Sequence, residues 1–226
     1  MVRRTKQEAL ATRNSILDAA ELLFQQHGVS RTSLHQIAET AQVTRGAVYW
    51  HFKDKADLFN AMMERATMPF EDAIGCCSRQ PGEDPLDFIC HRLVEVLRIT
   101  ATHPRTRRVV EISMHKMEYV DELLQVRDRR LAGRNECLAE CERQLKAAMR
   151  QGLIVSKVPA RCIALGLHSL VDGLIQNWML DPELFDLVKV GKQVLVTYMQ
   201  GLQSEAAAHA PARATRRVTP AVREPV

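Results

Sequence analysis

Residues 32–59, TSLHQIAETAQVTRGAVYWHFKDKADLF, decide the fold because they carry the start signals of three successive helices. Ser33 and Gln36 have the spacing of a capping box, in which each side chain satisfies a backbone N–H of the other residue. Thr44 is suited to be the N-cap of a second short helix, and Asp54 that of a longer third one. The stretch predicts two short helices joined by a tight turn and followed by a long helix.

The remainder of the chain also has helical periodicity. Ile16, Ala20 and Phe24 recur on one face of a helix that we expect to end before Gly28, because glycine readily adopts the left-handed conformation that follows a last helical turn. Prolines mark the expected starts of further helices, at Pro85, Pro104, Pro159 and Pro182. No segment has the alternation typical of a strand, so the predicted fold is all-α. Residues 204–226, rich in Ala, Pro and Arg, are expected to be disordered.

The composition is that of a globular protein, with 46% apolar and 26% charged residues. No apolar run approaches the length of a membrane span, and the basic residues near the N-terminus are not followed by the apolar segment of a secretory signal. We therefore expect a cytoplasmic protein without a membrane partner. The net charge of +4 is modest, but residues 1–55 carry eight Lys or Arg against five acids, which hints at a polyanion partner.

The six cysteines do not indicate a metal centre. They form no C-x-x-C pair and have no zinc-ligand spacing, so neither a metal ion nor another cofactor is expected. Cys137 and Cys141 would share a helix face, and they leave a redox-responsive regulator as the alternative function. No nucleophile motif or glycine-rich phosphate loop is present, which argues against an enzyme.

The helix expected over residues 45–52 has two different faces. Val48 and Phe52 lie toward its apolar side, where we expect them to enter the core. The opposite arc carries a cation, a residue without a side chain and two aromatic rings: Arg45, Gly46, Tyr49 and Trp50. A soluble protein rarely exposes such a surface without a use for it, and the pattern is that of a recognition helix in a helix-turn-helix motif.

At this level of detail, the stretch TSLHQIAETAQVTRGAVYWHFKDKADLF closely resembles the DNA-binding motif of the TetR/AcrR family. The segments MVRRTKQEA, HKMEY and VDGLIQNWML are similar to those of multidrug-efflux repressors of the AcrR and TtgR type, and the resemblance extends to about Gln203. It implies a three-helix helix-turn-helix DNA-binding domain in residues 1–53 and a six-helix ligand-binding and dimerisation domain in residues 54–203. It also implies a homodimeric repressor on palindromic double-stranded operator DNA, controlling an efflux operon and released by a small hydrophobic or amphipathic inducer.

The resemblance assigns residues to the DNA interface. Phosphate contacts at the start of the second helix would come from Thr32 and Ser33, and contacts with base edges and backbone from Thr44, Arg45 and Gly46. Further phosphate contacts would come from Tyr49, Trp50, His51 and Lys55. The family commonly has glycine where this chain has Gln42, and a positive φ at that position would cost glutamine ~1 kcal/mol.

The resemblance also assigns a mainly apolar ligand pocket. The matching positions are Phe70, Ile89, Val96, Val110, Met114, Cys137, Cys141, His168, Val171, Asp172, Ile175 and Gln176. Asp172 and Gln176 are one helical turn apart among apolar neighbours and would need partners if buried. Gly166 and Gly173, one heptad apart in the same segment, would allow a helix of the partner protomer to approach closely.

Overall fold

The computed structural model describes residues 6–74, 79 and 82–208, and in residues 68–74 and 203–208 it describes the backbone alone. In this part of the chain the structure has nine α-helices, one short 3₁₀ helix and no strand, which confirms the predicted all-α fold. The elements are α1 (Lys6–His27), α2 (Leu34–Thr40), α3 (Arg45–His51), α4 (Lys55–Ile74), α5 (Pro85–Thr102), α6 (Pro104–His115), η1 (Asp121–Leu123), α7 (Leu124–Arg150), α8 (Ala160–Leu180) and α9 (Leu187–Ala208).

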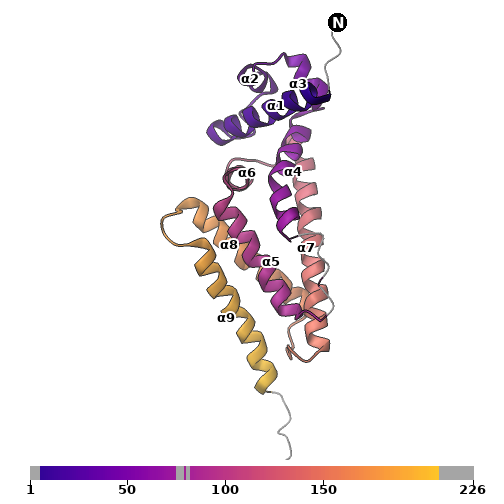
Figure 1. The fold of residues 1–226 in the computed structure, drawn as a ribbon, viewed down its shortest axis with the longest axis vertical. Helices are drawn as coiled ribbons and strands as arrows, with labels where there is room; N and C mark the ends of the chain where they lie inside the picture. The colour runs from indigo at the N-terminus through magenta and orange to yellow at the C-terminus, as the bar shows by residue number, and fades with distance from the viewer. Residues whose placement is uncertain (1–5, 75–78, 80–81, 209–226) are drawn as a thin grey trace, which may run out of the picture.

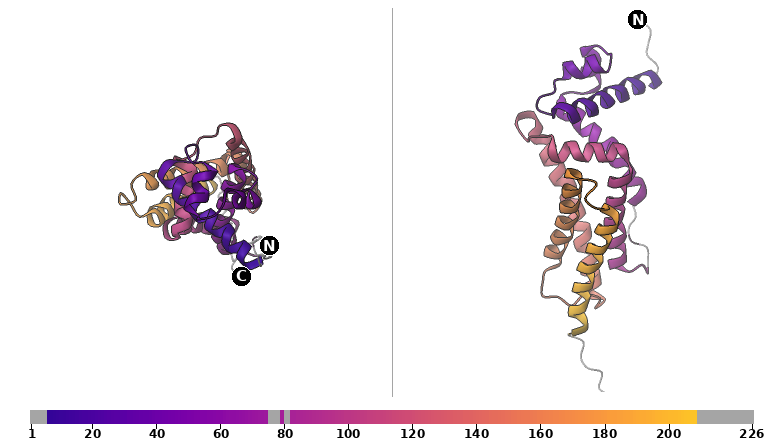
Figure 2. Two further views of the ribbon diagram at one scale, coloured as in Figure 1. Left: turned by 90° about the horizontal axis from the view of Figure 1, so that it is seen from above. Right: turned by 90° about the vertical axis from the view of Figure 1, so that its left-hand side faces the viewer.

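The molecule is elongated, with a small head at one end (Figure 1). The head consists of α1, α2 and α3, and α4 leads from it into a longer helical body in which it contacts α7. The helix α6 runs across the long axis directly beneath the head, while α8 and α9 lie on the side of the body away from α4 (Figure 2). The body therefore reaches the head through α4, α6 and the start of α7.

The capping interactions predicted for the two short helices of the head are confirmed. Ser33 Oγ accepts a hydrogen bond from the Gln36 backbone N–H at 3.2 Å, and Gln36 Oε1 accepts one from the Ser33 N–H at 2.8 Å. Thr44 Oγ1 caps α3 by accepting from the Ala47 N–H at 3.1 Å. Gln42, in the turn between the two helices, has a φ of +54°, so the conformation that favours glycine is present at this position.

The core of the head continues into the body. Val48 and Phe52 are buried as expected, in one apolar cluster with Phe24. The same cluster includes Phe59 of α4 and Ile112 of α6, so no break in packing separates the head from the helices beneath it. The domain boundary after residue 53 stays a prediction, and the apolar core extends across it.

A second apolar core fills the body between α5, α7, α8 and α9. On α8, Ile163, Leu167, Val171 and Trp178 are buried and recur on one face of the helix. Pro85 and Pro104 occupy the first turns of α5 and α6, as expected. None of the described helices is long and apolar enough to cross a membrane.

The expected helix start at Pro182 is wrong. The chain makes a turn there, closed by a hydrogen bond from the Leu184 N–H to the Asp181 carbonyl at 3.2 Å, and α9 begins only at Leu187. The Asp186 carboxylate accepts from the Lys189 N–H at 2.9 Å and so provides the N-terminal cap that the sequence expectation had overlooked.

The end of the last helix also differs from the expectation. The helix α9 continues to Ala208, beyond the predicted limit at residue 203, and its last residues include a run of alanine, the strongest helix former. The disorder predicted for residues 204–226 is therefore wrong for residues 204–208, and residues 209–226 lie outside the described part of the chain.

Candidate nucleic-acid interface and ligand cavity

The exposed face of α3 presents a preorganised pair of side chains. Tyr49 is 47% exposed and Trp50 is 72% exposed, although both are large aromatic residues. The Arg45 guanidinium lies 5.4 Å from the centroid of the Tyr49 ring and donates a hydrogen bond to Tyr49 Oη at 3.3 Å. This contact holds a cation and a phenol side by side on the outside of the helix, where both can reach phosphate or base-edge acceptors.

The remaining α3 residues make this surface accessible. A Cβ added at Gly46 would approach Thr44 Oγ1 at 3.9 Å and no other side chain more closely, so the backbone there is open to a close approach. The Trp50 ring packs edge-on against the His51 imidazole, with centroids 4.5 Å apart. The face predicted for DNA contact is thus distinct from the buried face of the same helix.

A cavity of about 510 Å³ lies beside this face, at the start of α2 and α4. It brings together four of the predicted DNA-contacting residues with three further ones: Ser33, Arg45, Tyr49 and Lys55 with Leu34, His35 and Glu122. Lys55 Nζ donates to the Thr32 carbonyl at 3.3 Å and is 3.6 Å from the Glu122 carboxylate. The sequence had indicated the basic residues but gave no signal that an acid from η1 lies among them.

Thr32 does not present its hydroxyl to this surface. Its side chain is buried, and the hydroxyl donates to the Gly28 carbonyl at 2.8 Å. The side-chain phosphate contact predicted for Thr32 therefore lacks an exposed donor, because the residue closes the turn after α1.

A buried ionic cluster joins the head to the body, and the sequence analysis had not identified it. Glu21 of α1 is 1% exposed and forms an ion pair with Arg65 of α4. Arg105 Nε and Arg108 Nη1 of α6 lie 3.4 and 3.6 Å from the two oxygens of the same carboxylate. One carboxylate therefore connects α1 with both helices of the body that pass beneath it.

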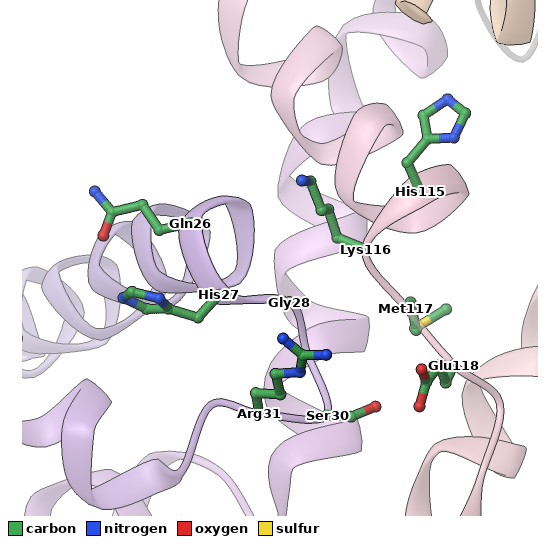
Figure 3. Close-up of a pocket in the computed structure, with 9 residues that line it drawn as sticks. All are labelled: Gln26, His27, Gly28, Ser30, Arg31, His115, Lys116, Met117 and Glu118. Carbon is green, nitrogen blue, oxygen red and sulfur yellow. The ribbon is translucent and has the colours of Figure 1, made fainter.

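A polar cleft of about 320 Å³ lies at the same joint, between the ends of α1 and α6 (Figure 3). A backbone hydrogen bond from the Val29 N–H to the Lys116 carbonyl, at 2.9 Å, joins the two segments that form the cleft. His27 is the last residue of α1, and Lys116 lies at the C-terminus of α6, where its cationic side chain offsets the partial negative charge of the last carbonyls. The ring of His115 points away from Arg31 (Figure 3), so the basic side chains do not converge on one point.

A more apolar groove of about 530 Å³ lies between α4 and α7. Phe59 and Met63 of α4 and Val126 of α7 contribute its apolar wall, and the side chains of Glu64 and Arg129, which form an ion pair, lie at its edge. An apolar cavity with a few polar groups is the usual form of a site for small organic molecules. Among the predicted ligand residues, Cys137 lines this groove.

Most of the other predicted ligand residues come together in the core of the body. The residues in or against this apolar cluster are Ile89, Val96, Val110, Met114, Cys141, Val171 and Ile175. The Phe70 side chain lies outside the described part of the chain. The structure thus supports an apolar neighbourhood for these positions, and their contact with a ligand stays a prediction.

Asp172 and Gln176 do not join that cluster. The Asp172 side chain is 48% exposed and lies 3.3 Å from the Nε2 atom of His168, one turn earlier, and Gln176 is exposed. Each follows a buried residue of α8, and a step of about 100° along the helix turns the side chain away from the core. Neither side chain is buried, so the condition under which they would need buried partners is not met, and their contact with a ligand stays a prediction.

The two glycines of α8 have different surroundings. A Cβ at Gly166 would lie 2.7 Å from Tyr198 Oη, so the close approach there involves α9 of the same chain and not a partner helix. A Cβ at Gly173 would meet no atom within 4 Å, so this position is open on the surface of the protomer.

The thiols of α7 do not resemble redox sensors. Burial raises the pKa of the Cys141 thiol to about 12, which keeps it protonated at neutral pH. A sensing cysteine reacts as the thiolate and needs a lowered pKa. The structure gives no support to the redox alternative, and no group of His, Cys, Asp and Glu in the described residues could hold a metal ion.

These features together define a helix-turn-helix transcription regulator. The head has a pair of capped short helices, the second of which exposes a cation and two aromatic rings, and a large helical body follows it. Residues 16–62 match the family model of bacterial regulatory proteins of the tetR family, and residues 84–204 match that of the C-terminal region of MAATS-type transcriptional repressors. The chain is 40% identical over 204 residues to the HTH-type transcriptional regulator AcrR of Shigella flexneri, covering 88% of this chain and 93% of that protein. The chain belongs to the TetR family.

Solved structures agree with this assignment. The structure of NalD, the secondary repressor of the MexAB-OprM multidrug efflux pump in Pseudomonas aeruginosa, is similar with a TM-score of 0.79 and 35% identity over 88% of this chain and 98% of that one. A complex of SmeT, the repressor of the Stenotrophomonas maltophilia pump SmeDEF, with triclosan has a TM-score of 0.73 and 32% identity over 84% and 91% of the two chains. The protein is thus a transcriptional repressor of TetR/AcrR type, related to efflux-operon repressors, and not an enzyme.

Proposed function

We propose that this protein represses a multidrug efflux operon in the cytoplasm by binding a palindromic operator as a homodimer, and that a hydrophobic or amphipathic compound releases it. The observation that carries the DNA-binding part is the contact between Arg45 and Tyr49 on the exposed face of α3. Two exposed aromatic rings on a seven-residue helix form an apolar surface that a partner would cover, and Arg45 beside them supplies a positive charge that suits DNA.

The proposed dimer uses the surface of α8 and α9 that faces away from α4. Leu165 is 52% exposed and Val196 is 41% exposed on these two helices, and Gly173 leaves room for another chain beside them. A twofold dimer brings two copies of α3 to one duplex, so that two half-sites together supply the specificity that one short helix lacks.

The proposed ligand site is the groove between α4 and α7. Its apolar wall suits a compound such as triclosan, which is bound in a solved structure of the related SmeT. Phe59 is shared by this groove and by the core of the head, where its ring centroid is 6.1 Å from that of Phe24. A compound in the groove would therefore act on a side chain that supports the recognition helix.

Induction requires that the compound distinguish two conformations of the dimer. A compound with equal affinity for the DNA-bound and released forms would not change operator binding. A ten-fold loss of operator affinity corresponds to ~1.4 kcal/mol of preference for the released form. We expect that preference to arise where α4 and α7 change their separation.

Operator binding by a Tyr49→Ala variant tests the DNA-binding part. The substitution should weaken specific binding by at least ~1 kcal/mol without loss of helix content, because the ring is on the outside of the head. Val155→Ala is the matched control, since Val155 is 44% exposed and lies in the connection between α7 and α8. Equal operator affinity of the Tyr49 variant and the wild type would remove the exposed face of α3 from the interface.

Calorimetry with triclosan tests the ligand part. Met63→Ala should weaken triclosan binding and operator release together, and its ligand-free operator affinity is measured separately because Met63 also packs against the core of the head. Asp172→Ala, at a position that the sequence had placed in the pocket, is the comparison. Loss of triclosan binding in the Asp172 variant alone would transfer the site to α8, and release by mild peroxide without any compound would favour a redox sensor.

A further inference from the structure

Lys55, the first residue of α4, is held by groups from two other parts of the chain. Its ammonium donates to the Thr32 carbonyl at 3.3 Å and lies 3.6 Å from the carboxylate of Glu122, and its side chain is only 13% exposed. Glu122 belongs to η1 and lines the cavity beside Arg45 and Tyr49. The cation at the start of α4 thus already has an anionic partner in the absence of DNA.

A carboxylate in this position opposes phosphate binding. A DNA phosphate gains affinity from a lysine by releasing condensed counterions, and an acid beside that lysine both occupies it and repels the phosphate. We propose that Glu122 is a counter-ion that competes with a DNA phosphate for Lys55, so that the body of the protein lowers the DNA affinity of the head. The inference rests on the proposed function, because it requires that Lys55 contacts the DNA backbone.

The backbone around Glu122 fixes its position. Asp121, the residue before it, has a φ of +46°, which non-glycine residues rarely adopt. Leu123, the residue after it, is buried in the core that fills the head, and its N–H donates to the Val120 carbonyl at 2.9 Å. The carboxylate is therefore placed by its two neighbours and not by a flexible surface loop.

The same segment continues into the wall of the proposed ligand groove. The helix α7 begins directly after η1, and Val126 and Arg129 of its first turns line that groove. Gln125, the second residue of α7, donates to the carboxylate of Asp54, the residue before α4, at 3.5 Å. A shift of the start of α7 would change the distance between Glu122 and Lys55 directly.

A purely structural role for the pair predicts a different result. In a purely structural role, the loss of this partly exposed ion pair would lower the unfolding temperature without strengthening DNA binding. The counter-ion role predicts stronger DNA binding when the acid is neutralised. The two roles are therefore separated by the sign of the change in DNA affinity.

The test measures fluorescence anisotropy of a labelled operator duplex, obtained by selection from a random library, and of an unrelated duplex of equal length. Glu122→Gln should bind both duplexes about five-fold more tightly, the factor that one unit-charge interaction over about 4 Å gives in water. Its plot of log affinity against log salt should be steeper by about 0.9, the slope of one additional phosphate contact. In a Lys55→Gln background the same substitution should give a clearly smaller gain, because only the repulsion between the carboxylate and the phosphate is then removed.

Glu118→Gln is the matched control, because Glu118 is an exposed acid of the same connection between α6 and α7. An equal gain from the Glu118 variant, a full gain in the Lys55→Gln background, or no gain in Glu122→Gln would each overturn the counter-ion role. If Lys55→Gln itself binds both duplexes as well as the wild type, then the DNA contact of Lys55 in the proposed function also fails. A weakened Lys55 variant together with an unchanged Glu122 variant refutes the counter-ion role alone.

Discussion

Two short helices of the head, α2 and α3, and two long helices of the body, α7 and α8, are held in place in different ways. In the head, α2 and α3 have seven residues each, and a side-chain cap from Ser33 or Thr44 closes the N-terminus of each. In the body, α7 has 27 residues and α8 has 21, and neither begins with a side-chain cap. Short helices depend on their ends because few internal hydrogen bonds offset the cost of nucleation, whereas long helices depend on the faces that they bury.

The difference has a consequence for function. The orientation of α3, and with it the placement of Arg45 and Tyr49, depends on one cap and two buried side chains, Val48 and Phe52. The long helices of the body make many packing contacts, so the position of each one does not depend on a single residue. Substitutions in the two regions should therefore have effects of different size, and they should differ in whether they change stability or DNA binding.

The largest expected effect is in the body. Leu167→Ala removes a fully buried side chain from α8 and should lower the free energy of unfolding by about 4 kcal/mol through the cavity that it leaves. Leu10→Ala, on a 58% exposed position of α1, is the control and should change it by less than about 0.5 kcal/mol. Chemical denaturation of both variants measures the difference, and similar values would show that α8 is not held by its buried face.

The joint between the two regions should give the next largest effect. Glu21→Ala leaves Arg65, whose side chain is 14% exposed, without its buried carboxylate, and should cost about 3 kcal/mol. This value is at the low end for a buried ion pair because Arg105 and Arg108 retain access to water. Glu21→Gln, which keeps an oxygen acceptor, should cost less. Equal losses in the two variants would indicate that packing and not charge holds the joint.

The cap of α3 should have a smaller effect on stability but a marked one on DNA binding. Thr44→Ala removes the acceptor for the Ala47 N–H and should cost about 1 kcal/mol of stability. Thr12→Ala is the control, because the Thr12 hydroxyl bonds the Glu8 carbonyl within α1 and caps no helix. The Thr44 variant should unfold at a lower temperature and bind the operator more weakly, whereas the Thr12 variant should change in neither property. Unchanged operator binding would mean that the cap does not orient α3.

The smallest effect is expected at the turn between α2 and α3. Gln42→Gly relieves the positive φ and should raise the stability by about 0.5 kcal/mol, after the greater entropy of unfolded glycine is subtracted. Gln193→Gly, at an exposed position inside α9, should instead lower it by about 1 kcal/mol. Opposite signs in denaturant titrations would confirm that the conformation of the turn decides the result.

The same difference between regions explains what the sequence could predict. The caps at Ser33 and Thr44, the helix end at Gly28 and the two faces of α3 depend on residues within four positions of one another, and all were predicted. The Glu21 cluster and the position of Glu122 depend on how distant helices cross, for which one sequence carries no local signal. The half-exposed position of Asp172 was equally hard to predict, because one residue along α8 separates the buried face from the exposed one.

The sharing of Phe59 between the head core and the groove also affects how compound recognition can evolve or be engineered. The side chain is 1% exposed, so a substitution that reshapes the groove from the α4 side also loosens the support of α3. The opposite wall, at Ala132 and Glu136 of α7, is exposed and does not form part of the core of the head. Under the proposed function, a variant library aimed at new compounds should therefore diversify α7 first, because Ala132 and Glu136 do not belong to the core that supports α3.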